Sequence, residues 1–122
     1  MLPPIQRCGP HCRSEMREDL FDEKVWSPPA HLPDLSSEKI ISVDVETRDP
    51  HLRDLGPGWT RNDGNLIGIA VAASDWSAYL PIAHEGGGNM AKNVVLTWLQ
   101  DQLDHGMSVV FHNAQYDLGW LL

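Results

Sequence analysis

The segment KIISVDVET, residues 39–47, decides the fold of this chain. Its first seven residues form a short and nearly continuous run of apolar and β-branched side chains, which is typical of a buried strand. Two acidic residues, Asp44 and Glu46, stand two positions apart within it. Side chains at positions i and i+2 of a strand point to the same face of a sheet. The segment therefore predicts a strand that carries two carboxylates side by side.

The residues after this strand predict a mixed α/β sheet flanked by helices. The third strand is expected to pair with the second in antiparallel, at an edge or near a strand end because it contains Pro81. The fourth follows a crossover helix and is expected to run parallel to a neighbour. The expected elements are a loop at residues 48–65, strands at 66–73, 77–82 and 107–111, and helices at 90–103 and from 114 onward.

Helix ends are marked by residues that favour caps. Asn89 is expected to cap the first helix, which buries an apolar face that includes Val94 and Val95, and Gly106 is expected to end it. Asn113 is expected to cap the last helix. Asp117 then falls in the first turn of that helix, where the helix dipole stabilises an anion.

Three carboxylates can meet in such a fold. If the fourth strand lies beside the first, the start of the last helix brings Asp117 towards Asp44 and Glu46. Carboxylates on an apolar strand are costly to bury without a partner. Arg48 is a candidate partner, but it follows the strand, and a divalent cation resolves the cost directly. Ligands made only of oxygen favour Mg²⁺ or Mn²⁺. Two such ions would activate a water and stabilise the leaving oxygen of a phosphoryl displacement.

Two motifs resemble those of a known enzyme family. SVDVET at residues 42–47 resembles the first motif, Asp-x-Glu, of the DnaQ-like 3′→5′ exonucleases, and HNAQYD at residues 112–117 resembles their second motif, Asn-x-x-(Phe/Tyr)-Asp. Between them, NLIGIAVA and SAYLPIAHE resemble a strand pair in the proofreading domain of bacterial DNA polymerase I and its phage relatives. The resemblance spans residues 36–122 and implies a ribonuclease H-like fold.

The resemblance implies a role for each matching residue. Asp44, Glu46 and Asp117 would hold two divalent cations, Mg²⁺ or Mn²⁺. Glu46 would also contact the 3′ hydroxyl of the substrate, which is a single-stranded 3′ end of DNA. Asn113 and Tyr116 would hold that end, and the backbone around Thr47 would lie near the last base. The reaction would hydrolyse the terminal phosphodiester and release nucleoside monophosphates.

The sequence departs from the family pattern at its C-terminal side. The third motif of the family, a Tyr or His followed four residues later by Asp, is absent from these residues. We therefore expect an exonuclease domain that is incomplete at the C-terminus, weak or inactive alone, and completed by a downstream polymerase region or a second polypeptide. Two alternatives stay open: a stand-alone ribonuclease like those of the RNase D group, and a non-catalytic remnant of the fold that binds nucleic acid.

Composition narrows the class of protein. The formal net charge of -8 is the wrong sign for a broad basic surface that grips duplex DNA. Two cysteines are too few for a disulfide scaffold, and no apolar run approaches the length of a membrane helix. Since the polar, proline-rich start does not resemble a signal peptide, we expect a cytoplasmic protein without membrane contact, in the bacterium or phage-infected cell that the resemblance implies. Residues 1–35 are rich in proline and read as a poorly ordered extension, with a short charged helix at 14–25.

Other polar and aromatic residues have ordinary explanations. His84 and His112 are not expected to bind metal, because the family site uses oxygen ligands. Cys8, His11 and Cys12 lack the second pair that a zinc finger needs. Trp76 and Trp98 are expected to pack, and so is Trp59, although its place in the glycine-rich loop would also allow it to stack on a base.

Overall fold

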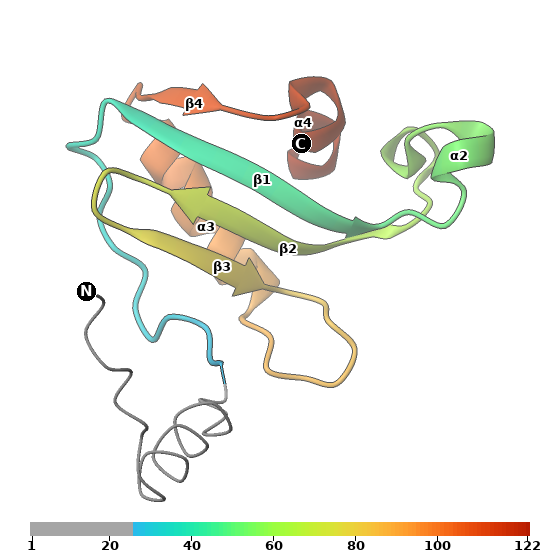
Figure 1. Ribbon diagram of the computed structural model, residues 1–122, viewed down its shortest axis with the longest axis horizontal. Coiled ribbons are helices and arrows are strands. Elements are labelled where there is room, and N and C mark those ends of the chain that lie inside the picture. Colours follow the sequence, from blue (N-terminus) through green and yellow to red (C-terminus); the bar gives the residue numbers. More distant parts are fainter. Residues whose placement is uncertain (1–25) are drawn as a thin grey trace, which may run out of the picture.

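The computed structural model describes residues 26–122, which form a four-stranded mixed sheet with helices packed against it (Figure 1). The strand order is β3-β2-β1-β4. Strand β2 pairs antiparallel with both β1 and β3, and β4 runs parallel to β1. The elements are β1 (Ile40–Arg48), α2 (Leu52–Leu55), the 3-10 helix η1 (Gly58–Arg61), β2 (Asn65–Ala72), β3 (Ser77–Pro81), α3 (Lys92–Leu103), β4 (Ser108–Val110) and α4 (Ala114–Leu121). The predicted α/β class and the order of its strands and main helices are confirmed.

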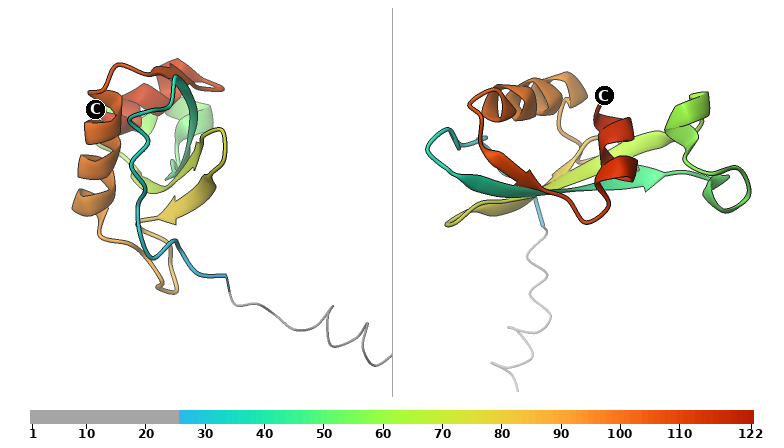
Figure 2. Two further views of the ribbon diagram at one scale, coloured as in Figure 1. Left: turned by 90° about the vertical axis from the view of Figure 1, so that its left-hand side faces the viewer. Right: turned by 90° about the horizontal axis from the view of Figure 1, so that it is seen from above.

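Strand β1 is buried on one face only, so the prediction of a strand buried throughout is wrong. Ile41, Val43 and Val45 are buried, whereas the residues between them, including Asp44 and Glu46, are exposed. Figure 2 gives the physical reason, since α3 and α4 lie on the same side of the sheet and no helix of residues 26–122 covers the opposite face. The alternation of side chains along the strand then separates core residues from carboxylates.

Helix α3 supplies the second layer of the core. Its Val95 and Leu99 are buried in one cluster with side chains of all three antiparallel strands, such as Ile69 and Leu80. Each buried aliphatic side chain of this kind contributes about 1.5–3 kcal/mol to the free energy of unfolding. The prediction that Val94 lies on the buried face of α3 is wrong, because 54% of its surface is exposed.

The start of α3 also differs from the prediction. The helix begins at Lys92, and no side chain caps it. Asn89 instead closes the preceding loop: its side chain accepts a hydrogen bond from the backbone N–H of His84 at 2.8 Å and donates one to the backbone carbonyl of His84 at 2.9 Å. The end of the helix is as predicted, since Gly106 has φ +81° and its N–H donates to the carbonyl of Leu103.

Part of the N-terminal segment packs against α3. Leu35 is buried in the core, and its backbone N–H donates to the buried Gln102 side chain at 2.7 Å. The indole of Trp98 donates to the carbonyl of Pro33 at 2.7 Å and packs edge-on against Trp76, which confirms the expected packing role of both tryptophans. The helix expected at residues 14–25 and the cluster of Cys8, His11 and Cys12 lie outside the described residues.

The segment between β1 and β2 is more ordered than the predicted loop. It folds into α2 and η1, because its backbone groups bond to one another. The N–H of Leu55 donates to the carbonyl of His51 at 2.8 Å, and Asn62 ends η1 in the left-handed conformation at φ 55°. Both helical turns extend beyond the end of β1, on the side where α4 lies (Figures 1 and 2).

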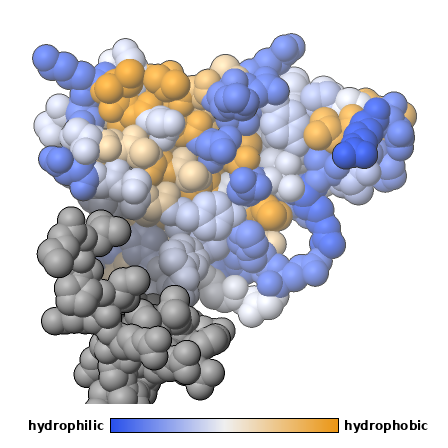
Figure 3. Space-filling model, viewed as in Figure 1, coloured by the Kyte–Doolittle hydropathy of each residue, from blue (hydrophilic) through white to orange (hydrophobic). Residues whose placement is uncertain are grey.

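The open face of the sheet is hydrophobic at one end and polar elsewhere. Figure 3 shows the hydrophobic area over β4 and the start of β1, where Ile40 and Val110 are about half exposed. Towards the other end of β1 the surface becomes hydrophilic (Figure 3). Among the described residues, no helix combines the length and the apolarity that a bilayer span requires.

Candidate functional site

Strand β4 ends where the acidic part of β1 begins. It pairs only with residues 40–42 of β1, and its last residue, Val110, lies opposite Ser42. The chain then turns into α4, which contacts both β1 and η1. Asp117 of α4 thereby comes close enough to β1 for the charge of Asp44 to act on its carboxyl.

Asp117 is the most unusual residue of the site. It is only 3% exposed, and its Oδ2 atom is buried without a hydrogen-bond partner. Burial raises the pKa of the Asp117 carboxyl, and the charge of Asp44 raises it further, while His112 acts in the opposite direction. A buried carboxylate beside a second carboxylate, with no cation to compensate it, is unfavourable for the folded state. The sequence predicted the approach of Asp117 to Asp44 but not this degree of burial.

Glu46 lies on the same strand face as Asp44 but has a different neighbour. In the sheet it is opposite Gly68, and a side chain at that position would collide with the ring of Tyr79 from β3. The missing side chain of Gly68 therefore lets the Tyr79 hydroxyl lie across it. Burial raises the pKa of Tyr79, and the charge of Glu46 adds to that increase. The Tyr79 hydroxyl also lies 2.5 Å from Nε2 of His84.

Arg48 does not neutralise these carboxylates, although it was a candidate to do so. Its guanidinium pairs instead with Glu85, at an N–O distance of 2.5 Å. The reason is its place at the very end of β1, where it reaches the loop that follows β3.

A chain of hydrogen bonds links β1, α4 and η1. The hydroxyls of Thr47 and Tyr116 lie 2.7 Å apart, and the Tyr116 hydroxyl donates to Oδ2 of Asp49 at 3.1 Å. Because tyrosine has a single hydroxyl proton, Thr47 is then the donor to Tyr116. The same Asp49 oxygen accepts a hydrogen bond from the backbone N–H of Gly58 at 3.0 Å, which links η1 to the hydroxyls of Tyr116 and Thr47. Sequence reasoning missed Asp49, since no local pattern marks a contact made 67 residues along the chain.

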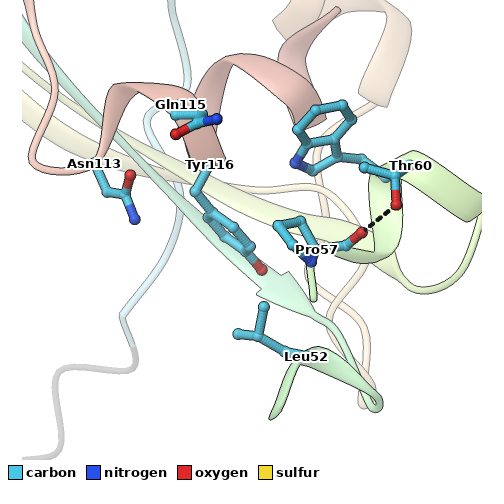
Figure 4. Close-up of a pocket in the computed structure, with 7 residues that line it drawn as sticks. Leu52, Pro57, Thr60, Asn113, Gln115 and Tyr116 are labelled. Atoms are coloured by element: carbon cyan, nitrogen blue, oxygen red, sulfur yellow. Dashed lines mark hydrogen bonds between the residues drawn. The ribbon is translucent and has the colours of Figure 1, made fainter. Parts of the chain in front are cut away.

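A pocket of about 540 Å³ opens between this chain of bonds and the α2–η1 segment (Figure 4). Asn113 and Tyr116, both predicted to hold substrate, line it. Asn113 precedes α4 as expected, but its side chain makes no capping hydrogen bond. The complete lining is Leu52, Pro57, Trp59, Thr60, Asn113, Gln115 and Tyr116.

Trp59 forms the wall between the pocket and α4. A Cβ atom added to Gly119 would collide with the Trp59 indole, so the ring lies directly against the helix backbone at that glycine. The indole N–H is buried without a partner. Trp59 therefore packs, as expected, and its position also places an aromatic ring at a pocket wall.

Replacing Gly119 by alanine is expected to lower the free energy of unfolding, because the new methyl group displaces the Trp59 ring. This result has the opposite sign to helix propensity, which favours alanine over glycine by about 1 kcal/mol within a helix. Thermal unfolding followed by circular dichroism measures it. The matched control is Leu118→Ala on the same helix, whose side chain is 41% exposed and should have a small effect. A stabilised Gly119→Ala variant would contradict the packing described here.

The predicted site residues thus fall into two neighbouring groups. Asp44 and Asp117 form the first, and Thr47, Asn113 and Tyr116 surround the end of β1 and the pocket. Glu46 lies on the face of Asp44 beside Tyr79. Within residues 26–122, no three His, Cys, Asp or Glu side chains are grouped closely enough to hold one metal ion. The prediction that Asp44, Glu46 and Asp117 meet at one point therefore remains a prediction.

Comparison with known proteins gives one informative match. No protein-family model matches this chain. A protein named DNA-directed DNA polymerase, from Pseudomonas phage M6, is 43% identical to it over 101 residues. That alignment covers 79% of this chain and 15% of the phage protein, so the chain is similar to a small part of a much longer polypeptide.

Proposed function

We propose that this chain is part of the 3′→5′ exonuclease domain of a DNA polymerase, with a ribonuclease H-like fold. Its reaction is hydrolysis of the 3′-terminal phosphodiester, with release of nucleoside monophosphates. The observation that carries the proposal is the buried Oδ2 of Asp117, which has no partner and lies near Asp44. A protein retains such an arrangement at a cost to stability, and perturbed carboxylates of this kind mark functional sites.

Three carboxylates would hold the divalent cations, although they are not grouped around one point within residues 26–122. Asp44 and Asp117 offer oxygen ligands, and Glu46 offers a third from the same strand face as Asp44. Oxygen-only sites favour Mg²⁺ or Mn²⁺. Such ions, when bound, lower the pKa of an attacking water and stabilise the leaving oxygen of an in-line displacement. Asp49 is not part of this set: its Oδ2 accepts hydrogen bonds from η1 and Tyr116, whereas its Oδ1 is buried without a partner.

The neighbouring residues position the nucleic acid end. Tyr116 is held by Thr47 and Asp49, so its ring is fixed at the mouth of the pocket (Figure 4). The side chain of Asn113 makes no capping bond, which leaves its amide to donate to and accept from a substrate. Aromatic rings at such a mouth stack on nucleobases without regard to sequence.

The similarity to a phage DNA polymerase favours a DNA substrate over RNA. A proofreading domain needs a polymerase on the same DNA end, and the downstream region of the same polypeptide, or a second chain, would supply it. The basic surface that holds the duplex would then belong to that region, which agrees with the acidic charge of this chain.

The polypeptide that carries this chain should shorten a single-stranded DNA oligonucleotide from its 3′ end only when Mg²⁺ or Mn²⁺ is present. A 5′-labelled oligonucleotide, followed on a denaturing gel, reports the shortening, and chromatography identifies the released nucleotides as monophosphates. Equal digestion of a matched RNA end would favour the RNase D-like alternative. Binding without cleavage would favour the non-catalytic remnant, and shortening that persists in EDTA would exclude the proposed chemistry.

A further inference from the structure

Arg48 is the last residue of the strand that carries Asp44 and Glu46. It follows Glu46 by two residues on β1 and, like Asp44 and Glu46, it is exposed. With Thr47 and His84 it lines a second pocket, of about 320 Å³, on the other side of the end of β1. The pocket lining is Thr47, Arg48, Ile67, Ala83, His84 and Glu85.

The present partner of Arg48 holds it weakly. The side chains of Arg48 and Glu85 are 63% and 78% exposed, and an ion pair this open to solvent contributes little to stability. Glu85 directly precedes Gly86, Gly87 and Gly88, all exposed and all with positive φ. Such a backbone lets the Glu85 side chain withdraw without disturbing a packed element. Arg48 can therefore exchange one anion for another.

The site needs a cation for the nucleic acid backbone. Asp44, Glu46 and Asp117 together repel a phosphate that is not neutralised. Of the five Lys and Arg residues within 26–122, Arg48 is the one that lies on β1. Arg61, for comparison, already has partners within its own segment, since its guanidinium donates to the backbone carbonyls of Leu55 and Gly56. A guanidinium binds phosphate oxygens through two parallel hydrogen bonds, which gives the contact a defined geometry.

We infer that Arg48 binds a backbone phosphate of the strand whose 3′ end enters the acidic site, and that Glu85 competes with this phosphate for the guanidinium. The identity of the strand rests on the proposed function, whereas the competition rests on the geometry alone. Glu85 then acts as a removable substitute for the phosphate, and it disfavours occupation of Arg48 by weakly bound anions.

The inference predicts opposite effects for the two members of the ion pair. Arg48→Ala should weaken binding of a 5′-fluorescein-labelled oligo(dT) of about eight nucleotides, long enough for one such site, by about tenfold. It should also reduce the dependence of log K on log[salt] by about 0.7, the loss of one single-strand phosphate contact. Glu85→Gln should tighten binding several-fold, because the guanidinium is released. Fluorescence anisotropy in EDTA measures all three quantities without cleavage.

Arg53→Ala, on the exposed helix α2, is the matched control and should leave the affinity almost unchanged. A purely structural ion pair would make Arg48→Ala and Glu85→Gln act in the same direction, and that outcome would overturn the inference. So would an unchanged affinity in both variants. Because binding is measured in EDTA, its result is independent of digestion. If the wild-type protein binds as described but does not digest DNA, the proposed function is contradicted, whereas this inference is not.

Discussion

Replacing Asp44 by asparagine is expected to reduce 3′-end digestion about a thousandfold, which corresponds to the several kcal/mol that a bound metal ion contributes to a transition state. The amide has nearly the shape of the carboxylate but lacks the charge that retains a divalent cation. Asp44 is exposed, so its replacement creates no cavity. Its charge also raises the pKa of Asp117, so its removal should not lower stability. Rates of shortening of a 5′-labelled oligonucleotide at saturating Mg²⁺ measure the effect.

Asp101→Asn is the control for that experiment. Asp101 is an exposed carboxylate on α3, outside both groups of site residues, and its loss should leave digestion unchanged. DNA synthesis by the same polypeptide should be unaffected in both variants. Wild-type digestion by Asp44→Asn would mean that the acidic face of β1 has no part in the chemistry.

Replacing Asp117 by asparagine should have two effects of opposite sign. Digestion should be lost as for Asp44→Asn, but in the absence of divalent cations the folded state should become more stable. The gain at neutral pH comes from the loss of a buried negative charge near Asp44, since the asparagine amide still leaves a polar group at the same buried place. For a domain of this size, each gain of about 1 kcal/mol raises Tm by several degrees. If Asp117 contributed only to stability, its replacement by asparagine would lower the Tm and leave digestion unchanged.

The pH dependence of this gain has a defined sign. In the folded state the pKa of Asp117 lies above its ordinary value of 3.8. Folded protein then binds more protons than unfolded protein between 3.8 and the raised pKa, so the free energy of unfolding falls as pH rises through that interval. Above the raised pKa the penalty is complete. The difference in stability between Asp117→Asn and wild type should therefore be small below 3.8, increase with pH, and then level off.

Urea unfolding of both proteins in EDTA across this pH range measures the contribution of the Asp117 carboxyl together with its interaction with Asp44. Mg²⁺ should stabilise wild type and have little effect on Asp117→Asn. A variant less stable than wild type at neutral pH, with the same response to Mg²⁺, would show that Asp117 is an ordinary structural acid.

The sequence predicts those features that depend on a local period or a helix end. The spacing of two residues between Asp44 and Glu46 places them on one face of β1, and the start of α4 brings Asp117 towards that strand. The antiparallel edge strand and the parallel β4 follow from the order of elements alone. These predictions succeed because neighbouring residues determine them.

Features that depend on distant contacts were beyond sequence reasoning. The loop at residues 48–65 was predicted without structure, yet Asp49 and Trp59 fasten it to α4 through contacts with Tyr116 and Gly119. Asn89 was predicted to cap α3 because of its residue type, but its side chain instead accepts a hydrogen bond from the backbone N–H of His84 in the preceding loop. Residue type indicates that an asparagine forms a local bond, and tertiary structure decides which one.

The central claim is that Asp44 and Asp117 form part of one divalent-cation site, and titration with Mn²⁺, followed by electron paramagnetic resonance of the free ion, tests it most directly. We predict that wild-type protein and Asp101→Asn remove Mn²⁺ from solution equally, and that Asp44→Asn and Asp117→Asn each bind it at least about tenfold more weakly, as expected when one carboxylate ligand is lost. Equal binding by all four proteins, or none by the wild type at millimolar Mn²⁺, would contradict the account.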